Sequence, residues 1–254
     1  MIRFNPLHFI LTRYNIGLYS EDAIADKAAW MEERLQLFEA HYLPSLAAQA
    51  PAIPFQVLLW IDPVTPEAEF NEIRRAVFRH DIPAEFHFKD PREALTAMLP
   101  AYRLAGYSHL LTSRLDNDDA FKEGALQAIQ DAARRFFETV RLNDGDEVSD
   151  NLIFIIDVLA ERLHRDGSRE PWKRAKPNGP FLSLCEPIAQ GKTRFITAWC
   201  GEHSKANKRF PAIFASLDRP YAVHTVHGTN AYRLRVRFQE SGTPWGIAKL
   251  KEEE

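Results

Sequence analysis

The residues with the clearest chemical potential are three aspartates in a stretch of four positions. Asp116, Asp118 and Asp119 directly follow an apolar run that includes Leu110 and Leu111. Carboxylates this close raise one another's pKa unless a positive charge lies among them. Mg²⁺ and Mn²⁺ prefer oxygen ligands, and they often combine one or two carboxylates with the phosphates of a substrate. The pattern therefore predicts a divalent-cation site with Asp116 and Asp118 as ligands.

The same pattern also suits a purely structural role. Asp and Asn are common in turns and at helix N-caps, and an isolated Asp-x-Asp is more often found there than at a metal. Two observations favour the chemical interpretation in this chain. An apolar segment typical of a strand precedes the motif, and Arg114 stands just before it.

A histidine late in the chain is the predicted third ligand. Of nine histidines, His203, His224 and His227 lie near expected turns of the second half. His227 follows a buried strand and precedes Gly228, where a backbone can approach a ligand closely. His224 lies inside that strand, where it is expected to be packed or hydrogen-bonded. A single histidine is more often structural than a metal ligand. The position of His227 makes it the favoured ligand, with His203 as the alternative.

The elements that must position these residues alternate regularly in the first half. Strands are predicted at 7–12, 55–61, 85–88 and 108–115, and helices at 20–38, 45–49, after Thr65-Pro66, at 91–104 and at 120–137. This alternation predicts a doubly wound, mainly parallel sheet flanked by helices. Parallel strands share one carboxyl edge, so Thr12, Arg13, Asp62 and the aspartates should meet there.

The second half has no such regularity. A strand or hairpin is expected at 152–165, and further strands are expected at 181–186, 194–199, 222–226 and 232–238, the last with a basic outer face. A basic connection at 166–179 is either a solvated loop or a lid that meets phosphates. The tail at 249–254 is expected to fray.

Composition narrows the class of protein. The 254 residues carry a net charge of −3, with 45% hydrophobic and 26% charged residues, as in ordinary globular proteins. The weak negative charge argues against a general nucleic-acid binder. Cys185 and Cys200 form no metal-binding pattern and fit a reducing, cytoplasmic setting. No secretory signal and no membrane-spanning run is visible, which leaves peripheral membrane contact open.

Several familiar catalytic signatures are absent from the sequence. There is no Gly-x-Ser-x-Gly nucleophile elbow, no Gly-x-x-x-x-Gly-Lys phosphate loop and no Gly-x-Gly-x-x-Gly dinucleotide motif. An α/β sheet that binds phosphates without a glycine-rich loop needs another device. A divalent ion held by carboxylates is the leading candidate.

A set of short segments, spread in order from residue 12 to residue 230, carries a family resemblance. The segments are Thr12-Arg13-Tyr14-Asn15, Arg34 with Leu37-Phe38, Leu43-Pro44-Ser45-Leu46 with Gln49, Trp60-Ile61-Asp62, Thr112 through Asp119, and His227-Gly228-Thr229-Asn230. Together they resemble the bacterial rhamnosyltransferase family, which is related to family 2-like glycosyltransferases with an Asp-x-Asp motif. The run from Arg114 to Asp119 is the most specific of them.

The resemblance implies a glycosyltransferase A-type fold, which is Rossmann-like, and a transferase that uses a nucleotide-sugar donor. Residues 1–137 would be the nucleotide-sugar-binding half, ending in the Asp-x-Asp turn and its following helix. Residues 138–254 would be the acceptor-binding half of the same domain. A glycan or lipid-linked acceptor and a role in surface polysaccharide synthesis are implied. The family name alone does not identify the sugar that is moved, although rhamnose is the one it suggests.

The resemblance also implies roles for single residues. Asp116 and Asp118 would hold Mn²⁺ or Mg²⁺ against the donor diphosphate. Asp62 would hold the nucleoside, and Thr12 and Arg13 would begin the nucleotide pocket.

The chemistry of glycosyl transfer then suggests further candidates. Charge develops on the leaving diphosphate, which Arg13 or Arg114 could meet with bidentate hydrogen bonds. The acceptor hydroxyl needs a general base, for which Asp119 and Glu186 are the candidates, Glu186 being slightly favoured because it comes from the acceptor half. Two other classes stay open: a nucleotidyltransferase, and a non-catalytic carbohydrate- or partner-binding domain that keeps the fold.

Overall fold

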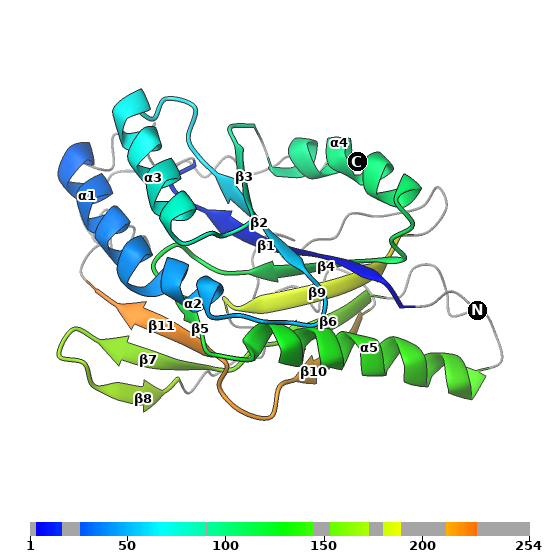
Figure 1. Cartoon of the computed structure of the whole chain (residues 1–254). Coiled ribbons are helices and arrows are strands. Elements are labelled where there is room, and N and C mark those ends of the chain that lie inside the picture. Colours follow the sequence, from blue (N-terminus) through cyan, green and yellow to red (C-terminus); the bar gives the residue numbers. More distant parts are fainter. Residues whose placement is uncertain are drawn as a thin grey trace, which may run out of the picture.

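The computed structural model describes residues 4–16, 26–89, 91–144, 153–172, 180–188 and 212–227. Two β-sheets and the helices packed against them make up this part of the chain (Figure 1). The predicted strands at 194–199 and 232–238, the tail at 249–254, residues 173–179 of the basic connection, and His203 lie outside the described residues.

The larger sheet has seven strands in the order β10-β6-β9-β4-β1-β2-β3. Strands β1 (Pro6–Arg13), β2 (Phe55–Trp60), β3 (Ala84–His87) and β4 (His109–Arg114) run parallel, as predicted. Strand β9 (Leu182–Pro187) runs antiparallel between β4 and β6 (Ile153–Asp157), and β10 (Ala212–Ser216) is parallel to β6. The two halves of the chain therefore share one mixed sheet.

The smaller sheet has four strands in the order β5-β11-β7-β8. They are β5 (Ala120–Phe121), β11 (Ala222–Val226), β7 (Ala160–His164) and β8 (Arg169–Pro171). Strand β5 follows the aspartates directly and pairs with β11, which brings a late segment of the chain against the Asp-rich turn.

The helices cover both faces of the large sheet. They are α1 (Lys27–Leu37), α2 (Leu43–Ala47), α3 (Glu67–Arg79), α4 (Pro91–Leu104) and α5 (Ala125–Asp144). A π-helical segment, Phe38–Tyr42, joins α1 to α2, so the helices predicted separately at 20–38 and 45–49 are continuous across residues 39–44. Asp26 caps the start of α1 by accepting a hydrogen bond from the Ala29 amide.

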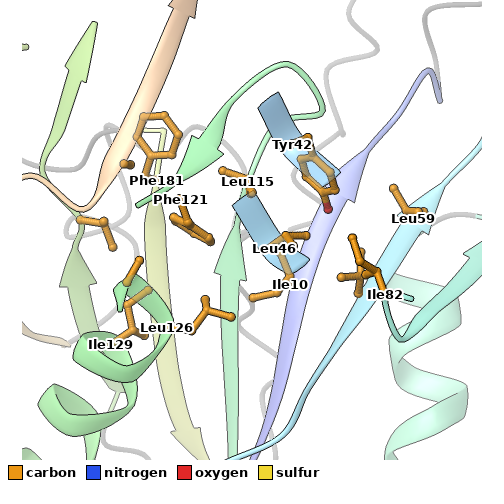
Figure 2. Packing of buried hydrophobic residues seen from close by; sticks show 14 of the residues in the cluster. Ile10, Tyr42, Leu46, Leu59, Ile82, Leu115, Phe121, Leu126, Ile129 and Phe181 are labelled. Atoms are coloured by element: carbon orange, nitrogen blue, oxygen red, sulfur yellow. The ribbon is translucent and has the colours of Figure 1, made fainter. Parts of the chain in front are cut away.

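Alternate residues of the strands build two cores on opposite faces of the sheet. Ile10 of β1 belongs to the larger core, which also contains Leu46 of α2 and Leu126 of α5 (Figure 2). Phe9 of β1 belongs to the other core, where Leu95 of α4 packs. This alternation follows from the two-residue period of a strand, and it explains why nearly continuous apolar runs form these buried strands.

The structure corrects two predicted elements. Residues 120 and 121 form a strand, and α5 begins at Ala125 after Gly124, whose φ of +77° favours glycine. The segment 152–165 is no hairpin, because β6 and β7 belong to different sheets. In the described part of the chain, no helix combines the length and the apolar character needed to cross a bilayer.

Gln49, just after α2, joins that helix to the region that follows the aspartates. Its side-chain amide donates to the carbonyls of Ser45 and Lys122, both at 2.9 Å, and its carbonyl accepts from the Leu126 amide at 3.2 Å. Replacing it with leucine leaves these backbone groups without their partner in a site where Gln49 is only 9% exposed. We predict that Gln49→Leu lowers the free energy of unfolding by ~2–4 kcal/mol, as measured by denaturant titration.

The matched control is Gln36→Leu, because Gln36 lies exposed on α1. Its effect should stay within ~0.5 kcal/mol. Equal losses in the two variants would show that the Gln49 hydrogen bonds do not hold these elements together.

Candidate functional site

The candidate site lies where the parallel strands of the large sheet end. The register pairs Arg13 at the end of β1 with Trp60 at the end of β2, and β4 runs beside β1 as far as Arg114. Asp62 and the aspartate turn, residues 116–119, follow these strands directly. They therefore lie along one edge of the sheet, as the alternation of strands and helices predicted.

Asp116 is partly exposed, and a guanidinium lies beside it. Its side chain is 33% exposed, and Nη2 of Arg114 is 3.2 Å from each of its carboxylate oxygens. The Asp119 amide donates to the Asp116 carbonyl at 3.0 Å and closes the turn. The rim of the site thus presents one cation and one anion side by side.

Asp118 points inward and is shared by two other side chains. Its Oδ2 lies 2.5 Å from Nη1 of Arg34 and 2.7 Å from Nε2 of His227. Burial alone would raise the pKa of Asp118, but the Arg34 guanidinium and the His227 contact hold it below its usual range. The Thr225 hydroxyl also donates to the Asp118 carbonyl at 2.5 Å. Strand β4, helix α1 and the end of β11 therefore converge on one carboxylate.

Arg34 is the residue at this site to which sequence reasoning gave no chemical role. Besides Asp118, its Nη1 donates to Oδ1 of Asn117 at 3.4 Å, and its guanidinium lies 5.2 Å from the centre of the Trp30 ring. The signal in the sequence was its place in the segment Arg34 with Leu37-Phe38. Its burial, which makes the contact with Asp118 important, is visible only in the fold.

The Asp119 side chain is almost fully enclosed, with 1% of it exposed. Its Oδ1 accepts from the Thr225 amide at 2.9 Å and lies 3.1 Å from Nδ1 of His224. Burial raises the pKa of Asp119 to about 7, although His224 acts against this shift. Burial would lower the pKa of His224, but Asp119 raises it above its ordinary value. The two groups thus form a coupled pair.

The remaining predicted nucleotide-binding residues differ in exposure. Arg13 is exposed at the sheet edge. Asp62 is 2% exposed and accepts a hydrogen bond from the Val64 amide at 3.1 Å, so part of its carboxylate caps the following turn. Thr12 is fully buried, and its hydroxyl lies 2.6 Å from the Tyr42 hydroxyl. The Thr12 side chain therefore faces the core rather than the edge.

Glu186 is not brought to the site. Because β9 is antiparallel to β4, Glu186 pairs with Leu110 near the start of β4, whereas Asp116 follows the end of that strand. The two candidate bases named from the sequence, Asp119 and Glu186, are therefore not brought together.

The three predicted metal ligands meet only in part. Within the described residues, no group of three or more His, Cys, Asp or Glu side chains is placed to hold a metal ion. Asp118 Oδ2 and His227 Nε2 do lie 2.7 Å apart. Adjacent ligands of an octahedral cation with bonds of ~2.0–2.1 Å are separated by ~3 Å, so these two donors fit a cation that a substrate would complete. The cation would replace the direct contact between them.

Arg34→Met tests the electrostatic account of Asp118. Removing the guanidinium leaves a buried carboxylate without its main counter-charge, which should cost ~3–5 kcal/mol of unfolding free energy at pH 7. The pKa of Asp118 is lower in the folded chain, so this stabilisation is present above pH ~4 and is lost as the pH falls towards the folded pKa. Denaturation over a pH series should therefore show the difference from wild type shrinking below pH ~4.

Arg75→Met is the matched control, because Arg75 and Glu72 form an exposed pair on α3 with side chains 65% and 56% exposed. Its effect should remain below ~1 kcal/mol. A loss of that small size in Arg34→Met as well would contradict the account.

Thr12 and Tyr42 allow a test of whether Thr12 is structural. Thr12→Val and Tyr42→Phe each leave one buried hydroxyl without its partner, which should cost ~1–3 kcal/mol, whereas the double variant removes both hydroxyls and should cost less than the sum. A double-mutant cycle in denaturant measures this coupling. Strictly additive losses would mean that the 2.6 Å contact contributes nothing.

Comparison with solved structures gives only loose likenesses. S. aureus TarS (residues 1–349) is 17% identical with a TM-score of 0.41, over 86% of this chain and 60% of that one. A "putative nucleotide-diphospho-sugar transferase" from Desulfovibrio desulfuricans G20 is 9% identical with a TM-score of 0.37, over 93% of this chain and 95% of that one. A cytidylyltransferase from Leptospira borgpetersenii is 9% identical with a TM-score of 0.36, over 85% of this chain and 78% of that one. Superpositions this loose carry no argument about activity or substrate.

Comparison at the level of sequence is more decisive. No curated protein matches the chain. A family model described as "Putative rhamnosyl transferase" matches residues 2–236, which is nearly the whole sequence and includes every residue of the site described above. The chain therefore belongs to this rhamnosyl transferase family and is, by that membership, a glycosyltransferase.

Proposed function

We propose that the protein transfers a sugar, with rhamnose as the first candidate, from a nucleoside-diphosphate donor to a hydroxyl acceptor, and that Mn²⁺ or Mg²⁺ assists it. The observation that carries this proposal is the 2.7 Å approach of His227 to Asp118 at the end of β4, beside the partly exposed Asp116. Family membership supports the reaction class. The nature of the donor atoms supports the cation, because a carboxylate and an imidazole both suit Mn²⁺.

The diphosphate would lie at the carboxyl edge of the sheet. When bound to Asp118 and His227, the cation would supply Lewis-acid stabilisation of the charge that develops on the leaving phosphate oxygen. Arg114 can reach the same diphosphate by giving up its contact with Asp116, and the exposed Arg13 can approach from the end of β1. Both would bind and orient the donor through bidentate hydrogen bonds.

Arg34 has a different part in this arrangement. It is buried and held between Asp118 and Trp30, so it can orient the carboxylate without contacting the donor. Because it offsets the charge of Asp118, the protein alone should hold a cation weakly, and the phosphates of the donor would complete the site.

The acceptor would approach from the side of the smaller sheet. Strand β11 of that sheet contacts the aspartate turn through Thr225 and His224. A glycan or lipid-linked hydroxyl compound is the proposed acceptor class, with surface polysaccharide synthesis as the proposed setting.

A panel of nucleotide sugars incubated with Mn²⁺ tests the reaction class. Slow release of nucleoside diphosphate from one of them supports a glycosyltransferase. Release of pyrophosphate from nucleoside triphosphate and sugar phosphate would indicate a nucleotidyltransferase instead. Binding without turnover would leave a carbohydrate- or partner-binding domain.

Asp118→Asn tests the proposed cation site. The amide keeps the shape of the side chain but removes the charge, so Mn²⁺-dependent binding of the nucleoside diphosphate should fall by at least tenfold in calorimetry, and turnover should be lost. His227→Gln should weaken the same binding to a smaller extent. Asp131→Asn is the control, because Asp131 lies on α5 and pairs with Arg134, and it should bind as wild type does. Unchanged Mn²⁺-dependent binding in Asp118→Asn would overturn the proposed site.

A further inference from the structure

The fold places Asp119 where it cannot touch an acceptor. Only 1% of the side chain is exposed. Its Oδ1 accepts from the Thr225 amide, and both carboxylate oxygens lie within 3.3 Å of Nδ1 of His224. A carboxylate enclosed in this way acts on its surroundings through the imidazole that it contacts.

His224 is the accessible end of this pair, and its ring is held in place. Its side chain is 24% exposed, against 1% for Asp119. The ring stacks on Trp172 with centroids 4.5 Å apart and planes 22° apart. The Arg162 guanidinium lies 5.2 Å from the centre of the Trp172 ring. Since Nδ1 faces Asp119, Nε2 is directed away from the carboxylate, and it makes no hydrogen bond within the described part of the chain.

The contact with Asp119 also determines which nitrogen is basic. A carboxylate oxygen accepts a hydrogen bond, so Nδ1 of His224 carries the proton that it donates, and the neutral ring has its lone pair on Nε2. The same logic orients the histidine of a Ser-His-Asp triad. The assignment of the tautomer follows from this hydrogen-bond network.

His224 is tied closely to the proposed donor site. Thr225, the next residue, bonds both to Asp119 and to the Asp118 carbonyl, and His227 on the same segment contacts the Asp118 side chain. The imidazole therefore keeps a fixed relation to the carboxylate that would hold the donor's cation.

We propose that His224 is the general base that activates the acceptor hydroxyl, and that Asp119 is the positioning residue that orients it; this inference rests on the proposed function. In a single displacement, Nε2 takes the hydroxyl proton while the acceptor oxygen forms a bond to the anomeric carbon. The bond from that carbon to the diphosphate oxygen breaks, and its electron pair leaves with the diphosphate. Asp119 keeps its hydrogen bond to Nδ1 throughout and stabilises the imidazolium.

The experiment compares two nucleophiles on the donor identified by the nucleotide-sugar panel. Water or an alcohol must lose a proton to react, whereas azide attacks carbon without losing one. For His224→Ala and His224→Gln, turnover with water or alcohol should fall by ~10²–10⁴-fold. Turnover with azide should remain within a few-fold of the wild-type value, so that added azide restores nucleoside diphosphate release. Mn²⁺-dependent nucleotide binding should be unchanged.

Asp119→Asn and a control variant complete the series. Asp119→Asn should also slow the water reaction and show the same azide rescue, because the ring stays stacked on Trp172 but loses the carboxylate that fixes its tautomer. His164→Ala, on the neighbouring strand β7, should behave as wild type with both nucleophiles.

The other outcomes would overturn the role of His224, and only the last of them would also overturn the proposed function. An equal fall with water and azide, or a loss of nucleotide binding, would make His224 structural and overturn the inference while leaving the proposed function standing. Unchanged turnover with water or alcohol would also overturn it. If wild-type protein releases no nucleoside diphosphate from any donor, the proposed function fails, and the inference fails with it.

Discussion

The buried ion pair between Arg34 and Asp118 is the interaction on which the rest of the site depends. A carboxylate removed from water is unfavourable unless charge and hydrogen bonds replace the water. Arg34 provides both, from a helix that lies 84 positions away in the sequence, and His227 adds a second contact across 109 positions. The end of β4 is thereby fixed between α1 and the segment after β11.

Two adjacent aspartates in one turn have opposite electrostatic environments. The pKa of Asp118 is held below its usual range by a guanidinium and an imidazole, whereas burial raises the pKa of Asp119 to about 7. Neighbouring acids whose pKa values are driven apart commonly divide acid–base work between them. Here the division matches the proposed roles, since one carboxylate stays ionised next to the donor and the other is coupled to a histidine on the acceptor side.

Much of this architecture could be predicted from the sequence, because it depends on local pattern. The alternation of apolar strands and amphipathic helices was enough to predict parallel β1, β2 and β4, and hence a shared edge for Arg13, Asp62 and the aspartate turn. Asp118 and His227 were named as ligands of one cation, His227 because of its place between a buried strand and Gly228, and the fold brings these two side chains into contact.

The sequence could not place residues whose position non-local packing decides. Glu186 was named with Asp119 as a candidate base, but β9 enters the sheet in the antiparallel direction and carries Glu186 to the far end of β4. Thr12 was expected in the pocket, but the alternation of a strand turns its side chain to Tyr42. The role of Arg34 and the enclosure of Asp119 depend on contacts across more than 80 positions, which no sequence window contains.

The central claim is that Asp118, held in place by Arg34, binds a cation together with His227 and the donor diphosphate. Pulsed electron paramagnetic resonance on Mn²⁺ tests this claim most directly. With nucleoside diphosphate present and histidine labelled with ¹⁵N, the account predicts a nitrogen coupling to the manganese that disappears in His227→Gln and persists in His164→Ala. A manganese–nucleotide complex without any histidine nitrogen in its coordination shell would contradict the account, as would a failure of the protein to bind the two together.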